Sequence, residues 1–129
     1  MAFLFKQTKK NSIENRPWGN FETLNSFPVS KQAGNAVIKK ITVNPLNRLS
    51  YQSHTKRSEH WYVIQGQGKV TLNDKVSSIN LGQSIDISIG TKHRIENTDK
   101  NVGLIFIEIS LGDFAENDII RYEDDYGRK

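Results

Sequence analysis

Short runs of alternating apolar and polar residues dominate the pattern along this chain. The clearest read "AVIKKITV", "HWYVIQG", "GKVTLND" and "GLIFIEIS", and Gly, Asn, Asp or Pro separates them. Alternation with a period of two is typical of β-strands with one buried face, and hardly any stretch has the period of a helix. The runs recur about every 8 to 12 residues, as strands do in sandwiches and small barrels. The pattern therefore predicts an all-β fold in which side chains of one parity fill the interior.

The same pattern divides the chain into parts. Residues 1–15 have mixed polarity and are predicted to form a loose N-terminal arm or a short helix. Residues 16–129 are predicted to form a single domain, because 129 residues with 36% hydrophobic content leave little room for a second core. Within it, "LNDKV" at 72–76 predicts a tight hairpin turn. The closing segment "GDFAENDIIRYEDDYGRK" is polar and aromatic enough to pack back over a barrel mouth.

Composition narrows the classes of function. The chain has no cysteine, so a bound metal must take nitrogen and oxygen ligands. The first apolar run is too short for a signal peptide and no segment approaches the roughly 20 apolar residues of a membrane span, so we expect a cytoplasmic protein without membrane contact. The pI near 9.4 and net charge of +4 are compatible with nucleic acid or with an anionic small substrate. The Lys and Arg residues are scattered and no aromatic-and-basic platform stands out, so nucleic-acid binding is not expected.

Metal-ligating and anion-binding side chains are concentrated in "QSHTKRSEHW". Gln52 and His54 stand two apart and therefore project from the same face of a strand. Glu59 has the wrong parity to share that face on one unbroken strand, but a turn at "TKRS" would place it on the next strand. Glu59, Trp61 and Val63 would then point inward together.

The third histidine, His93, lies in "GQSIDISIGTKHRIEN", where Gly90 permits a turn just before its strand. Two imidazoles, a carboxylate and an amide oxygen can then converge on one divalent cation and leave a coordination position open. An isolated histidine in a β-protein is more often a surface or hydrogen-bonded residue. The metal hypothesis therefore requires the ring nitrogens of His54 and His93 to lie within roughly 4 to 5 Å of each other.

These residues resemble the two motifs of the cupin superfamily. The first, G-x5-H-x-H-x3-4-E-x6-G, matches in spacing at Leu46, Gln52, His54, Glu59 and Gly66. The second, G-x5-P-x-G-x2-H-x3-N, matches in spacing at Gly82, Ser88, Gly90, His93 and Asn97. The departures, which exclude the plain germin-like version, are Leu46, Gln52 and Ser88.

A narrower resemblance covers residues 16–128. "RPWGNFETL", "IKKITVNP", "RLSYQSH", "QSHTKRSEHW", "GTKHRIEN" and "DIIRYEDDYGR" are similar to the isomerase domain of type II mannose-6-phosphate isomerases, often the C-terminal part of bifunctional mannose-1-phosphate guanylyltransferases. The resemblance implies a cupin double-stranded β-helix that interconverts mannose 6-phosphate and fructose 6-phosphate. It also implies a divalent metal ion, with Zn, Mn, Co, Ni and Fe not distinguished. The expected metal ligands are Gln52, His54, Glu59 and His93.

Aldose–ketose isomerisation moves a proton between C1 and C2 through an enediol, so the site needs an electrophile, here the metal, and a base. The acid–base candidates are Glu59, His60 and Glu108. His60 points to the opposite face from Glu59 if the strand is regular, which favours a packing role. Glu108, within "GLIFIEIS", either lines the cavity with a raised pKa or is a partly exposed edge residue.

A sugar phosphate also needs a cationic clamp, for which the fork of arginine is suited. The substrate-binding candidates are Arg48, Arg57, Arg121 and Arg128. Each can equally be a solvated surface charge. Lys39 and Lys40 are weaker candidates, because neighbouring strand residues face opposite ways and at most one of them faces a cavity. Trp18 is expected to pack into the core in preference to stacking on a sugar.

The sequence leaves alternatives open. The same barrel suits a non-catalytic or divergent cupin that binds a phosphorylated or nucleotide-linked sugar. Gln52 counts against an oxygen-using iron cupin, because such sites prefer a triad of histidines and a carboxylate. No Gly-rich phosphate loop precedes a helix, so nucleotidyl transfer is not expected of this chain. A homodimer is expected, since open barrels leave strand edges that a second subunit can cover.

Overall fold

The computed structural model describes residues 12–113 and 117–128, and every regular element in this part of the chain is a β-strand. In chain order the strands are β1 (Ile13–Arg16), β2 (Gly19–Ser30), β3 (Gly34–Val43), β4 (Tyr51–Ser53), β5 (Arg57–Gln65), β6 (Gln67–Leu72), β7 (Lys75–Asn80), β8 (Ser84–Ile87), β9 (His93–Asn97), β10 (Leu104–Gly112) and β11 (Ile120–Glu123). The described residues include no helix that is long and apolar enough to cross a membrane.

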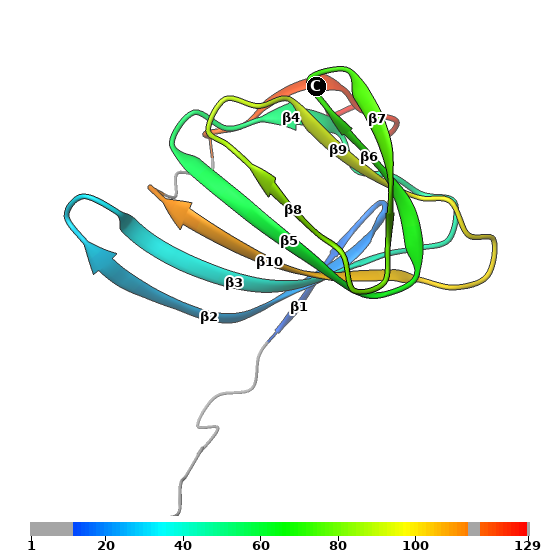
Figure 1. Ribbon diagram of the computed structural model, residues 1–129, viewed down its shortest axis with the longest axis horizontal. Coiled ribbons are helices and arrows are strands. Elements are labelled where there is room, and N and C mark those ends of the chain that lie inside the picture. Colours follow the sequence, from blue (N-terminus) through cyan, green and yellow to red (C-terminus); the bar gives the residue numbers. More distant parts are fainter. Residues whose placement is uncertain (1–11, 114–116, 129) are drawn as a thin grey trace, which may run out of the picture.

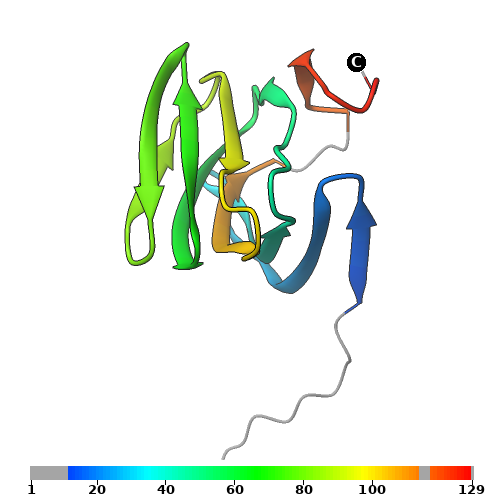
Figure 2. The ribbon, with the colours of Figure 1, turned by 90° about the vertical axis from the view of Figure 1, so that its right-hand side faces the viewer.

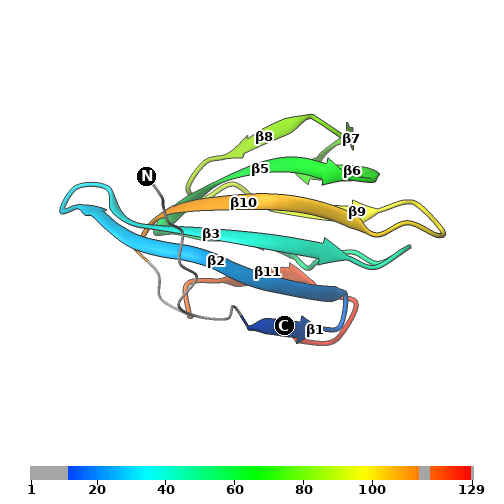
Figure 3. The same cartoon turned by 90° about the horizontal axis from the view of Figure 1, so that it is seen from below.

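The strands form two antiparallel sheets that face each other (Figure 1). The large sheet has the order β1-β2-β3-β10-β5-β8, and Figure 3 shows these strands side by side. The small sheet has the order β11-β4-β9-β6-β7. Strands far apart in sequence are neighbours in both sheets, as where β10 pairs with β3 from Leu104 opposite Val43 to Gly112 opposite Asn35. The predicted all-β class is confirmed.

Strand parity decides which side chains enter the space between the sheets. On β5, Glu59, Trp61 and Val63 are buried, whereas the intervening His60 and Tyr62 lie on the outer face. The prediction that the first three point inward is therefore confirmed. The apolar core that both sheets fill consists of Trp18, Ile41, Val43, Trp61, Val63, Val70, Ile79, Ile87, Ile95, Leu104 and Phe106.

Two local predictions are also confirmed. Trp18 is 6% exposed and belongs to the core. The turn in "LNDKV" joins β6 to β7, and its central residues Asn73 and Asp74 have φ angles of 45° and 71°, as a two-residue hairpin turn requires.

Both ends of the described chain meet the sheets on the same side of the molecule (Figure 2). Of the segment expected to be an arm, residues 1–11 lie outside the described residues, but β1 starts at Ile13 and pairs with β2. The sheet therefore begins inside that segment. Near the C-terminus, β11 pairs with β4, with Arg121 opposite Gln52, so the closing segment packs back onto the barrel as predicted. The end strands of the large sheet are β1 and β8, and the homodimer stays a prediction.

We expect Phe106→Ala to lower the free energy of unfolding by about 3 to 5 kcal/mol, because it empties a site that is fully buried. The Phe106 ring packs against the Trp61 indole with their centroids 5.0 Å apart. Urea unfolding of the purified chain measures the loss. Ile109→Ala, on the outer face of the same strand and 43% exposed, is the control and should cost about 0.5 kcal/mol or less. Equal losses would contradict this assignment of the core.

Candidate metal centre

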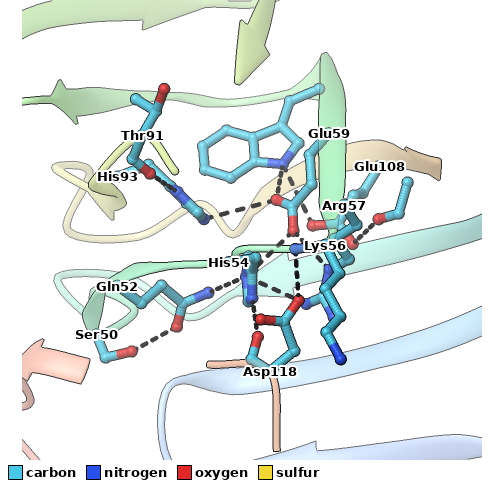
Figure 4. A network of polar contacts seen from close by, with 12 residues as sticks. Ser50, Gln52, His54, Lys56, Arg57, Glu59, Thr91, His93, Glu108 and Asp118 are labelled. Carbon is cyan, nitrogen blue, oxygen red and sulfur yellow. Dashed lines mark hydrogen bonds and ion pairs between the residues drawn. The ribbon is translucent and has the colours of Figure 1, made fainter. Parts of the chain in front are cut away.

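Three buried side chains meet between the two sheets (Figure 4). Each of His54, Glu59 and His93 offers one ligand atom within 4.8 Å of the others. The Glu59 Oε2 atom lies 3.3 Å from His54 Nε2, and Glu59 Oε1 lies 3.7 Å from His93 Nε2. The ring nitrogens of His54 and His93 therefore lie within the distance that the metal hypothesis requires.

The topology explains why these residues meet. His54 follows β4 and His93 begins β9, and these strands pair where Gln52 lies opposite His93. Glu59 reaches the histidines from β5 in the facing sheet. The turn predicted at Gly90 has a φ of 82°, which favours glycine, and the Gly90 N–H donates to the His54 carbonyl oxygen at 2.8 Å. This hydrogen bond ties together the two segments that carry the histidines.

Backbone carbonyls fix the tautomers of both imidazoles. His54 Nδ1 lies 2.7 Å from the Asp118 carbonyl oxygen, and His93 Nδ1 lies 2.8 Å from the Thr91 carbonyl oxygen. A carbonyl oxygen can accept but not donate, so each Nδ1 carries the proton. In a neutral ring, Nε2 then presents a lone pair, which is the state that binds a metal ion.

Burial keeps both rings neutral at pH 7. Desolvation is the main reason that the pKa of His54 is lowered to about 4, and the nearby Arg57 cation lowers it further. Desolvation also lowers the pKa of His93. Neutral imidazoles beside a carboxylate are the donor set that a divalent cation such as Zn²⁺ takes.

One atom in this cluster tests whether the residues fit a cation. Among the described residues, His93 Nε2 is buried and makes no hydrogen bond. A buried acceptor without a partner is costly, and a cation beside Glu59 would satisfy it. The arrangement of His54, Glu59 and His93 therefore fits a divalent metal ion.

Gln52, the fourth expected ligand, lies beside the cluster in a different orientation. Its amide nitrogen is 3.3 Å from His54 Nε2, and its amide oxygen accepts a hydrogen bond from Ser50 Oγ at 2.6 Å. Ligation through that oxygen requires the amide to rotate by about 180°. The orientation of the amide is decided by its hydrogen-bond partners. The structure thus places Gln52 beside the cluster with its amide nitrogen, and not its amide oxygen, toward His54.

A second carboxylate lies next to Glu59. The Trp61 indole N–H donates to Glu59 Oε1 at 3.1 Å and to Glu108 Oε2 at 3.2 Å, and Ser110 Oγ donates to Glu108 Oε1. Burial, and after it the Glu59 charge, raises the pKa of Glu108 to about 7. Glu108 is 8% exposed and belongs to the pocket lining. The first of the two alternatives, a carboxylate that lines the cavity, therefore holds, and Glu108 is not a partly exposed edge residue.

The third acid–base candidate is not at the site. His60 lies on the outer face of β5, where its Nδ1 pairs with the Asp86 carboxylate and its side chain is 42% exposed. Successive strand residues face opposite ways, so Glu59 and His60 cannot both reach the interior. A catalytic role for His60 is therefore wrong on geometric grounds.

A pocket brings the carboxylates together with cationic side chains. Its lining comes from the large sheet, the β1–β2 hairpin, the β4 region and the C-terminal segment. The acidic lining residues are Glu59 and Glu108, and the cationic ones are Arg16, Lys39, Arg57, Arg121 and Arg128. The excess of positive charge suits an anionic ligand.

Comparison with known proteins shows the family to which the chain belongs. A family model described as "Mannose-6-phosphate isomerase C-terminal" matches residues 5–124. The chain belongs to this family. The chain is 39% identical over 114 residues to the mannose-1-phosphate guanylyltransferase ManC of Salmonella typhimurium, and the match covers 88% of this chain. It spans 22% of the length of that relative.

Solved structures match the family member in fold. The capsular polysaccharide assembling protein CapF of Staphylococcus aureus superposes with a TM-score of 0.74 at 17% identity, over 90% of this chain and 35% of that chain. The Cnp3 cupin domain of Schizosaccharomyces pombe superposes with a TM-score of 0.63 at 11% identity, over 79% and 69% of the two chains. The cupin double-stranded β-helix is thereby confirmed.

The structure changes the set of arginines expected to bind substrate. The pocket of this chain is lined by Arg57, Arg121 and Arg128, but not by Arg48. Arg48 instead makes a two-pronged hydrogen bond to Asp125, with distances of 2.7 and 2.8 Å, and so fastens the C-terminal segment. The prediction that Arg48 binds substrate is corrected, because Arg48 lies outside the pocket lining and its guanidinium holds Asp125 instead.

Three residues that line the pocket or support the cluster were not predicted from the sequence or were weaker candidates there. Arg16 lines the pocket, although in the sequence it belongs to "RPWG" and carries no ligand spacing. Lys39 also lines it and lies opposite Glu108 in the pairing of β3 with β10, whereas Lys40 does not line it. Asp118 accepts hydrogen bonds through its carboxylate from Thr55 N, Thr55 Oγ1 and Lys56 N. These contacts, first the one from the Thr55 hydroxyl, lower the pKa of Asp118 to about 2.

We expect Asp118→Asn to weaken divalent-cation binding by about tenfold, the lower end of the effect that lost support of a metal ligand has. The substitution keeps the backbone carbonyl that accepts from His54 Nδ1. It weakens the side-chain acceptor of Thr55 and Lys56, and with it the position of the segment that carries the His54 ring. Titration calorimetry with Zn²⁺ measures the affinity. Asp99→Asn is the matched control, because Asp99 also accepts backbone N–H groups, from Asn101 and Val102, but on a remote loop. Unchanged affinity in Asp118→Asn would contradict the positioning role.

We expect the ion pair between Asp124 and Arg128 to make the stability of the fold depend on pH. Hydrogen bonds from the guanidinium, and less strongly from the backbone N–H, of Arg128 lower the pKa of Asp124 to about 2. A carboxyl group with a lower pKa in the folded than in the unfolded chain stabilises the fold above its unfolded pKa of about 4. That stabilisation is lost as the pH falls from about 4 to about 2.

Urea unfolding of wild type and Asp124→Asn at several pH values tests this prediction. The wild-type chain should be the more stable at about pH 6, and the gap should close near pH 2. A gap that is independent of pH would contradict it.

Proposed function

We propose that this chain is a metal-dependent aldose–ketose isomerase that interconverts mannose 6-phosphate and fructose 6-phosphate. One observation carries the proposal. A single pocket lining combines the candidate cation ligand Glu59 with a second buried carboxylate, Glu108, and with side chains that suit a phosphate. Membership of the isomerase C-terminal family supports the same reaction.

Substrate binding falls to the cationic side of the pocket. Arg57, Arg121 and Arg16 lie in the lining together with the aromatic rings of Trp18 and Phe21. Guanidinium groups bind phosphate oxygens through two parallel hydrogen bonds, while the aromatic rings offer apolar contact to the sugar. The proposed orientation has the phosphate among the arginines and C1 and C2 at the carboxylates.

The two carboxylates have different tasks in this proposal. Glu59 would hold the cation with His54 and His93, and Gln52 would join them after rotation of its amide. When bound, the cation supplies electrophilic stabilisation of negative charge on the C1 and C2 oxygens. Glu59 is then engaged as a ligand and is not available as the base.

Glu108 is the proposed base. Hydrogen bonds from Trp61 Nε1 and Ser110 Oγ hold its carboxylate in one orientation in the pocket wall. It removes the proton from C2 of mannose 6-phosphate, which leaves an enediolate. The C1 oxygen then takes up a proton while the C2 hydroxyl gives one up, and Glu108 delivers the carbon-bound proton to C1 to form fructose 6-phosphate. In the reverse direction the same group carries the proton from C1 to C2.

We expect the purified chain to form fructose 6-phosphate from mannose 6-phosphate in a coupled assay, and a chelator to abolish turnover. Glu108→Gln should lower kcat by about 10² to 10⁴, the contribution of a positioned base, and should keep cation affinity within about threefold. His60→Ala should keep wild-type kcat, because His60 lies outside the pocket.

Two outcomes would contradict the proposal. If Glu108→Gln kept the wild-type kcat and His60→Ala lost turnover, the assignment of Glu108 as the base would be rejected. Cation-dependent binding of mannose 6-phosphate without turnover, across Zn²⁺, Mn²⁺, Co²⁺, Ni²⁺ and Fe²⁺, would assign a binding role in place of an enzymatic one.

A further inference from the structure

The Arg57 guanidinium contacts two of the three groups in the metal cluster. Its Nη2 lies 3.1 Å from His54 Nε2, and its Nε donates to Glu59 Oε2 at 3.3 Å (Figure 4). The same Glu59 oxygen lies 3.3 Å from His54 Nε2. A positive side chain is thus placed at the ligand atoms that a cation would use.

These contacts cannot coexist unchanged with a bound cation. Neutral imidazole has one lone pair on its unprotonated nitrogen, and His54 Nδ1 carries the proton. The His54 Nε2 lone pair therefore serves either an N–H donor or a metal ion, and of its two N–H neighbours the Arg57 guanidinium, at 3.1 Å, is closer than the Gln52 amide, at 3.3 Å. Repulsion between a divalent cation and the guanidinium acts in the same direction. Cation binding must move the guanidinium away from His54.

The pocket offers that guanidinium a second location. Arg57 starts β5 and lines the pocket that also contains Arg16, Arg121 and Arg128. A dianion held there can accept two parallel hydrogen bonds from the fork of Arg57. Such an anion favours the orientation in which Arg57 has left the cluster.

We propose that Arg57 couples the binding of the cation and of the substrate phosphate, by occupying the metal ligands until an anion in the pocket draws it away. This inference rests on the proposed function for its two ligands but concerns their mutual affinity. Coupling free energies are reciprocal, so the anion tightens cation binding by the same factor as the cation tightens anion binding.

Cation affinity measured with and without a simple dianion tests the coupling. Inorganic sulfate is the probe, because it has the charge of a phosphate monoester but lacks the sugar hydroxyls that could reach the metal themselves. The Kd for Co²⁺ is measured by chelator competition, in chloride and in sulfate at equal ionic strength. In wild type, sulfate should tighten Co²⁺ binding by about fivefold or more, within the usual range of such couplings.

Arg57→Ala should bind Co²⁺ about tenfold more tightly than wild type in chloride, and sulfate should no longer change its affinity. Arg57→Gln serves as a second variant without the charge, and circular dichroism checks that both fold. Arg16→Ala is the matched control in chloride. It removes a pocket cation that contacts none of the three ligands in the described structure, so its Co²⁺ affinity should stay within about twofold of wild type.

The outcomes separate this inference from the isomerase proposal. Equal Co²⁺ affinity of wild type and both Arg57 variants in chloride, or a gain that Arg16→Ala reproduces, would overturn the coupling while leaving isomerase turnover intact. Coupling without turnover would uphold the inference and reject the enzymatic function. A wild-type chain that binds no Co²⁺ would overturn both.

Discussion

The site depends on the two hydrogen bonds that fix the imidazole tautomers. His54 and His93 each donate through Nδ1 to a backbone carbonyl oxygen, of Asp118 and Thr91 respectively. These acceptors turn both Nε2 atoms toward Glu59, and burial keeps the rings neutral. If either ring had the opposite tautomer, a proton would stand where a cation needs a lone pair. The backbone therefore sets the chemistry of the cluster.

The first of these hydrogen bonds makes the C-terminal segment part of the candidate metal centre. Its residues 117–128 pair with β4 through β11 and carry Asp118 to the His54 ring. The segment is fastened at several further points, including Arg48 to Asp125 and the Tyr126 hydroxyl to Asn47 Oδ1. Because the same segment supplies Arg121 and Arg128 to the pocket, the proposed anion-binding side chains and the candidate metal ligand His54 are held in place by one segment.

Much of the fold and of the cation cluster could be predicted from sequence, because both follow from local rules. A period of two places Glu59, Trp61 and Val63 inside, and the same rule already indicated that His60 faces outward. The spacing of the two cupin motifs brings His54 and His93 to neighbouring strands. These predictions use information that lies within a few residues of each side chain.

The arginines required information that no short window contains. Arg48 and Arg16 are both cationic residues near strand ends, but Arg48 meets Asp125, whereas Arg16 reaches the pocket because β1 is the end strand beside β2. Which of them faces the ligand depends on how segments distant in sequence are placed together. The amide orientation of Gln52 is likewise set by a partner, Ser50 Oγ, that the cupin motifs do not include.

The charges around the pocket also indicate which arginine is best prepared for an anion. The fork of Arg128 is engaged by the Asp124 carboxylate at 2.9 and 3.0 Å, so much of its charge is compensated within the protein. Arg121 has no such carboxylate partner among the described residues, and its buried Nε makes no hydrogen bond there. Burial, and after it the charge of Arg128, lowers the pKa of Arg121. A partly buried cation that lies near another cation gains more from a dianion than one that already has a counter-ion. In the proposed function, Arg121 is therefore the arginine best placed to bind the phosphate, and the ion pair between Arg128 and Asp124 holds the adjacent wall of the pocket.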